Sequence, residues 1–80
     1  MGRALSTRTI AERGLRIYQK KLKARLDRSH RGEIVVINVL TGDYVLGPTP
    51  SEAIKAFQAK FPGQPSYVMR VGELAVWTKG

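Results

Sequence analysis

Residues 33–46 read Glu-Ile-Val-Val-Ile-Asn-Val-Leu-Thr-Gly-Asp-Tyr-Val-Leu, and they predict more of the architecture than any other part of the chain. The run of β-branched residues at 33–40 is typical of a buried strand. Thr41-Gly42-Asp43 is a short turn that contains glycine, and residues 44–46 predict the return strand. Together they predict a β-hairpin in the middle of the chain.

A second helix and two more strands are expected on the C-terminal side of this hairpin. Thr49 is the expected N-cap of the helix, Pro50 its first residue and Glu52 the partner in a capping box. Its expected buried side chains are Ala53, Ile54, Phe57 and Phe61. Residues 67–71 and 74–77 alternate in the manner of strands around Gly72 and predict a second hairpin.

Residues 8–28, on the N-terminal side, predict one amphipathic helix, because apolar side chains recur at spacings of three and four. The expected buried stripe is Ala11, Leu15, Tyr18, Leu22 and Leu26. Lys21, Arg25 and Arg28 flank this stripe. On the opposite side lies a ladder about 15 Å long, given a rise of 1.5 Å per residue. This basic face is the candidate partner- or nucleic-acid-binding site: Arg13, Arg16, Lys20 and Lys23.

Thr7 or Thr9 is the expected N-cap of that helix, with Glu12 completing a capping box from Thr9. Gly14 marks either a close helix contact or a later start of the helix. The element order is therefore α-ββ-α-ββ, which predicts an α+β fold with a four-stranded, mainly antiparallel sheet and a long basic N-terminal helix. Residues 1–80 are expected to form one domain, with the helix at 8–28 and a ββαββ body at 33–77.

The chain has 80 residues and a formal net charge of +8, from 14 Lys+Arg and 6 Asp+Glu. Residues 1–32 hold ten of the basic side chains and only two acidic ones, Glu12 and Asp27, whereas residues 33–80 are neutral. Such asymmetry indicates an anionic partner for the N-terminal segment, or a solvated face that keeps the protein in solution. No apolar run is long enough to span a membrane.

Few residues suit catalysis or metal binding. The chain has no Cys and one His, which excludes disulfides and Cys- or His-cluster metal sites. Each acidic residue of the body falls at an expected turn or cap, so no carboxylate pair is placed for acid–base chemistry. We therefore expect a protein that is not an enzyme and needs no cofactor or metal.

The stretch from Gly32 to Gly47, followed by a Glu-Ala helix, Pro-Gly and Tyr-Val-Met-Arg-Val-Gly, resembles a family of small uncharacterised bacterial proteins, common in cyanobacteria. The similarity covers roughly residues 15–77. Members are often encoded beside a small retropepsin-like aspartic protease and are sometimes described as antitoxin-like. The resemblance implies a partner-binding role and no catalytic residues. Its recurring positions are Asn38, Thr41, Gly42, Asp43, Tyr44, Arg70 and Gly72. Among these, Arg70 is the residue expected to pair, with Asp43 or with a carboxylate of the partner.

Two functional hypotheses follow. The first is a cytoplasmic interaction or regulatory module, antitoxin-like, that binds a protein partner. The second is mostly electrostatic binding of DNA or RNA by the basic face, because Asn and Gln, which specific base recognition favours, are scarce there and only Gln19 is near. A homodimer is compatible with both, since a small core gains from association.

Overall fold

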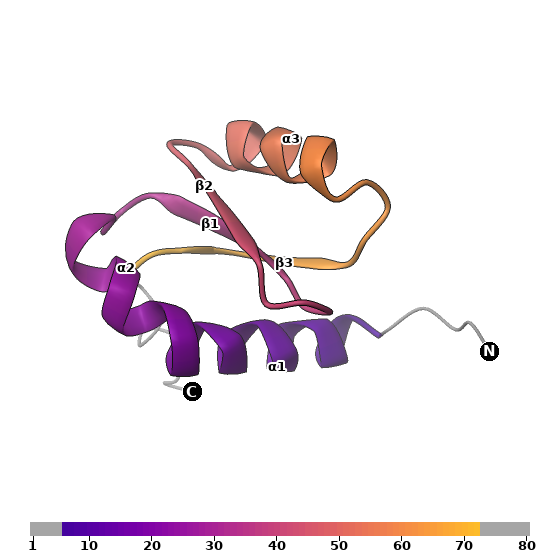
Figure 1. Cartoon of the computed structure of the whole chain (residues 1–80), viewed down its shortest axis with the longest axis horizontal. Coiled ribbons are helices and arrows are strands. Elements are labelled where there is room, and N and C mark those ends of the chain that lie inside the picture. The colour runs from indigo at the N-terminus through magenta and orange to yellow at the C-terminus, as the bar shows by residue number, and fades with distance from the viewer. Residues whose placement is uncertain (1–5, 73–80) are drawn as a thin grey trace.

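The computed structural model describes residues 6–72. A nearly continuous helical stretch comes first, followed by two strands, a helix and a third strand (Figure 1). The elements are α1 (Thr7–Ile17), the π-helical turn η1 (Tyr18–Leu22), α2 (Lys23–Ser29), β1 (Ile34–Asn38), β2 (Tyr44–Gly47), α3 (Pro50–Lys60) and β3 (Ser66–Arg70).

The sheet has the order β2-β1-β3, and both pairings are antiparallel. The α+β class and the hairpin at residues 33–46 are confirmed, whereas the prediction of four strands is wrong, because the sheet of the described residues has three. β1 is the central strand: Ile37 pairs with Tyr44 of β2 on one side and with Tyr67 of β3 on the other. β3 is therefore the neighbour of β1 on the side opposite to β2. The strand expected at 74–77 lies outside the described residues.

Helices cover both faces of the sheet (Figure 1). Successive side chains of a strand point to opposite faces, so β1 contributes to two apolar clusters. Val35 and Ile37 pack with Tyr18, Leu22 and Leu26 of the long helical stretch and with Val71. On the other face, the cluster is Ile34, Val36, Ala53 and Phe57. All five residues of β1 are buried, as expected of a central strand covered on both sides.

The predicted helix at 8–28 is present but is interrupted by one π-helical turn. The backbone N–H of Lys23 donates to the carbonyl of Tyr18, five residues earlier. Such turns widen the helix and bend it, and the direction of the ribbon changes between α1 and α2 in Figure 1. Because a wider turn accommodates more than 3.6 residues, Tyr18 and Leu22 stay in line with Leu26, and these side chains are at most 3% exposed. Ala11 and Leu15 are only half-buried.

Local signals of the sequence are correct at α3 and partly wrong at α1. Thr49 caps α3 by accepting a hydrogen bond from the N–H of Glu52, with Pro50 at the first position, as predicted. Ile54, expected to be buried, is 37% exposed. Ser6, and not Thr7 or Thr9, caps α1 by accepting from the N–H of Thr9.

Gly14 marks a close helix contact, the first of the two alternatives. It is buried, and a Cβ at this position would overlap the side chain of Tyr67 on β3. The absence of a side chain therefore lets α1 lie directly against the outer strand of the sheet.

Candidate nucleic-acid interface

The basic side chains of the long helical stretch remain on the surface. Arg13, Arg16, Lys20 and Lys23, the predicted basic face, are all exposed. Lys23 differs from the other three because its ammonium forms an ion pair with Asp27 at 3.0 Å. Within residues 6–72, no carboxylate pairs with the remaining three. We refer to Arg13, Arg16 and Lys20 as the outer basic face.

The outer basic face follows the bend of the helix. Arg13 and Arg16 lie on α1, three residues apart, and Lys20 lies within the π-helical turn. The rise along a straight α-helix would space them by about 4.5 and 6 Å. The turn therefore ends a short, regular ladder, and the predicted fourth member, Lys23, begins α2 beyond it.

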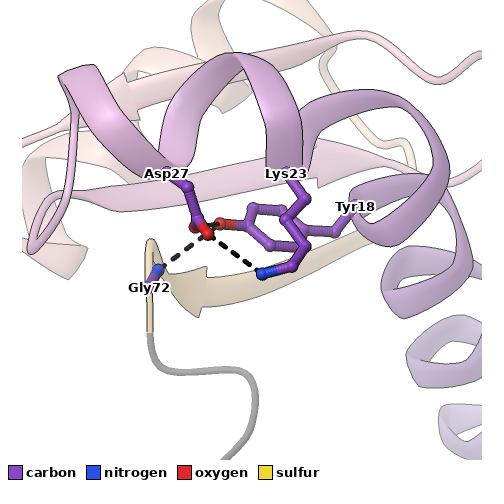
Figure 2. A network of polar contacts seen from close by, with 4 residues as sticks. All are labelled: Tyr18, Lys23, Asp27 and Gly72. Atoms are coloured by element: carbon purple, nitrogen blue, oxygen red, sulfur yellow. Dashed lines mark hydrogen bonds and ion pairs between the residues drawn. The ribbon is translucent and has the colours of Figure 1, made fainter.

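A polar network fixes the orientation of this helix against the sheet (Figure 2). The buried hydroxyl of Tyr18 donates to Asp27 at 2.8 Å and accepts from the backbone N–H of Gly72 at 3.4 Å. Burial and the bond to Asp27 raise the pKa of Tyr18 to about 12. Lys23 and the Tyr18 hydroxyl both hold the pKa of Asp27 below its usual value. The network links Tyr18 in the π-helical turn and Asp27 in α2 to the backbone of Gly72, two residues after β3.

A cleft of about 450 Å³ lies where the helix meets the turn between β1 and β2. It was not predicted, because its three cations come from three elements: Lys21 from η1, Arg25 from α2 and Lys60 from the end of α3. The only signal in the sequence was that Lys21 and Arg25 flank the buried stripe. We refer to Lys21, Arg25 and Lys60 as the cationic cleft. Its other lining residues are Leu22, Gly42, Asp43 and Tyr44.

The structure does not bring Arg70 and Asp43 together. Arg70 pairs with Ile34 at the start of β1, whereas Asp43 lies beside Asn38 at the end of that strand. At about 3.4 Å per residue, these positions are separated by roughly 13 Å. Arg70 donates from Nη1 to the carbonyl of Gly32 at 3.0 Å, and Asp43 accepts from the hydroxyl of Thr41 at 3.0 Å. Pairing of Arg70 with a carboxylate of a partner protein stays a prediction.

Acidic and histidine side chains are scattered in the part of the chain that the structure describes. No group of three of them there is placed to hold a metal ion. The closest such pair is His30 and Glu33, whose Nδ1 and Oε2 atoms are 3.2 Å apart in the loop that follows α2. None of the helices within residues 6–72 combines the length and the apolar character that a membrane crossing requires.

Comparisons of the chain with family models, curated proteins and solved structures found no match. The resemblance to the small bacterial family with the Thr-Gly-Asp-Tyr hairpin therefore stays a prediction.

Proposed function

We propose that this chain binds nucleic acid electrostatically, by placing the outer basic face along the phosphate backbone. The observation that supports this most strongly is the exposure of three neighbouring cations without a carboxylate partner among residues 6–72. Arg and Lys side chains in such a row neutralise phosphates and release their counterions. The proposal keeps the cytoplasmic location that the sequence favours, and nucleic acid is abundant there.

Binding of this kind carries little sequence preference. Arg13, Arg16 and Lys20 can all donate to phosphate oxygens, but adenine is usually read by Asn or Gln. Gln19 is the one exposed amide beside this face. Arg13 and Arg16 can also read guanine, but in the proposed arrangement they contact phosphates, so we expect strands of different sequence to bind with similar affinity.

The hypothesis of an antitoxin-like protein partner rests on the family resemblance and stays a prediction. The polyanion hypothesis has the stronger physical support, because the charge that it requires is concentrated on one exposed helix. The proposed role is that of a binding module, with no reaction assigned to it.

Fluorescence anisotropy with a labelled oligonucleotide of mixed sequence tests the proposal. At low salt, Arg16→Glu with Lys20→Glu is expected to abolish measurable binding, because two attractive contacts become repulsive. Both side chains are exposed, so the variant should fold like the parent chain.

Lys55→Glu is the matched control for Arg16→Glu, because each changes the net charge by the same amount. Lys55 is exposed on α3, on the opposite side of the sheet from the long helix. Arg16→Glu should weaken binding about tenfold or more, in line with a lost charged contact, and Lys55→Glu only slightly. Equal weakening by the two variants would show that total charge, and not the outer basic face, accounts for binding.

A further inference from the structure

The cationic cleft is a second concentration of positive charge and differs in kind from the outer basic face. Lys21, Arg25 and Lys60 approach one hollow from three elements. None of them pairs with a carboxylate within residues 6–72, although Asp43 lines the same cleft. Three cations and one carboxylate leave a net charge of +2. A recess that holds like charges together in this way attracts an anion.

The turn at the floor of the cleft is held rigidly by Asn38. This side chain is fully buried, and its Oδ1 accepts from the backbone N–H groups of Leu40 and Thr41. Its amide nitrogen donates to Gln64 at 2.7 Å. The backbone N–H of Gly42 donates to the carbonyl of Asn38 at 2.8 Å. The floor is therefore already ordered without a ligand, which lowers the entropic cost of binding.

The turn places Lys21 beside its backbone and holds Asp43 by a local contact. Gly42 has a φ of +89°, and a Cβ there would stand 3.4 Å from the ammonium nitrogen of Lys21, which places this cation beside the turn. Oδ2 of Asp43 accepts from the Thr41 hydroxyl, and the carboxylate forms no ion pair with the cations of the cleft.

We infer that the cationic cleft binds a phosphomonoester, at the 5′ end of a nucleic-acid strand or on a free nucleotide. Such a group carries a charge of about −1.5 to −2 at neutral pH and presents three terminal oxygens, which match the net charge and the number of cations. An internal phosphodiester carries one charge and has two terminal oxygens. A carboxylate likewise carries only one charge and has only two oxygens. The inference does not depend on the outer basic face.

The cleft also has room for more than the phosphate. Its volume lies within the range of about 300–1,000 Å³ that is usual for small-molecule sites. Tyr44 lines it and is half-buried. An aromatic ring beside a phosphate site offers a surface to a base or sugar. A nucleotide is therefore a better match in size than phosphate alone.

NMR titration of the full chain with adenosine 5′-monophosphate tests the inference, with adenosine as the ligand that lacks the phosphate. We expect the nucleotide, and not adenosine, to shift the amide signals of Gly42 and Asp43. Lys21→Gln with Lys60→Gln should weaken binding at least about tenfold, since charged contacts are lost. The matched control is Arg8→Gln with Lys55→Gln, which removes the same charge from exposed positions outside both the cleft and the outer basic face and should leave the affinity within about twofold.

The source of the phosphate is distinguished by a trinucleotide with and without a 5′-phosphate. If the 5′-phosphate increases the affinity of the trinucleotide more than the phosphate of the mononucleotide does over adenosine, the site prefers a strand end. An equal or smaller increase indicates a free nucleotide, and either result supports the site. Equal shifts with adenosine, equal weakening in the two variants, or no shift at millimolar nucleotide would overturn it. Because Arg13, Arg16 and Lys20 remain in every variant and each comparison changes only the terminal phosphate, these outcomes are independent of binding at the outer basic face.

Discussion

The outer basic face and the cationic cleft arise from the same helical stretch but differ in how the fold uses them. Arg13, Arg16 and Lys20 need only the helix, since their spacing alone aligns them. Lys21 is the next residue after Lys20, yet it becomes part of a site only because β1, β2 and α3 pack around it. A row of charge suits an extended polyanion, and a convergent group suits a single compact anion. Changes that weaken the packing of the helix on the sheet should therefore disturb the cleft more than the row.

The largest effect is expected from Tyr18→Ala, which should unseat the helix. Tyr18 is fully buried in the larger apolar cluster, and removal of such a ring costs about 3–5 kcal/mol. The change also removes the hydroxyl that joins Asp27 to Gly72. Urea unfolding followed by circular dichroism should show a much lower midpoint. A loss below about 1 kcal/mol would mean that Tyr18 does not anchor the helix.

An intermediate effect is expected from Gly14→Ala, which presses α1 away from β3. The added Cβ would overlap Tyr67, and overpacking costs about 1–3 kcal/mol, partly offset by the better helix propensity of alanine, about 1 kcal/mol. Because the overlap is severe, we expect the upper end of that cost and a net loss of about 2 kcal/mol in urea unfolding. A more stable variant would show that the helix does not lie this close to the sheet.

The smallest effect is expected from Tyr18→Phe, which keeps the ring and removes the hydroxyl. The hydroxyl donates to Asp27 and accepts a long bond from Gly72. The loss near pH 7 should be about 1.5 kcal/mol, the lower end for a hydrogen bond to a charged group, because Asp27 is only partly buried. The folded state raises the pKa of Tyr18 to about 12 and so favours the neutral phenol. The resulting stabilisation is complete below about pH 10 and is lost as the pH rises toward 12. The difference between parent and variant should therefore narrow over this interval, and a constant difference would contradict the raised pKa.

The outer basic face could be predicted from the sequence because it depends on helical periodicity alone. The ion pair that separates Lys23 from the outer basic face could also have been predicted, since Lys23 and Asp27 are four residues apart and such side chains meet on a helix. The π-helical turn could not be predicted, because it accompanies the packing of Tyr18 and Leu22 against the sheet. The cationic cleft could not be predicted either, since no local pattern relates Lys60 to Lys21.

The sheet was misjudged for a similar reason. The segment at 67–71 was expected to form a hairpin with 74–77, but alternation says nothing about which strands pair. Within the described residues, β3 pairs with β1 from Ile34 to Asn38, a contact between segments about 30 positions apart that no local pattern indicates. The capping of α3 was correct because Thr49, Pro50 and Glu52 act within one turn.

The salt dependence of nucleic-acid binding shows whether the outer basic face holds the phosphate backbone. Affinity for a duplex without terminal phosphates should fall with salt at a log–log slope near −2.7, about −0.9 for each of three contacts. Arg16→Gln with Lys20→Gln, which removes two contacts without adding repulsion, should flatten the slope by about 1.8 units, and Lys21→Gln with Lys60→Gln should leave it nearly unchanged. Equal flattening in the two variants would mean that the outer basic face is not where the backbone binds.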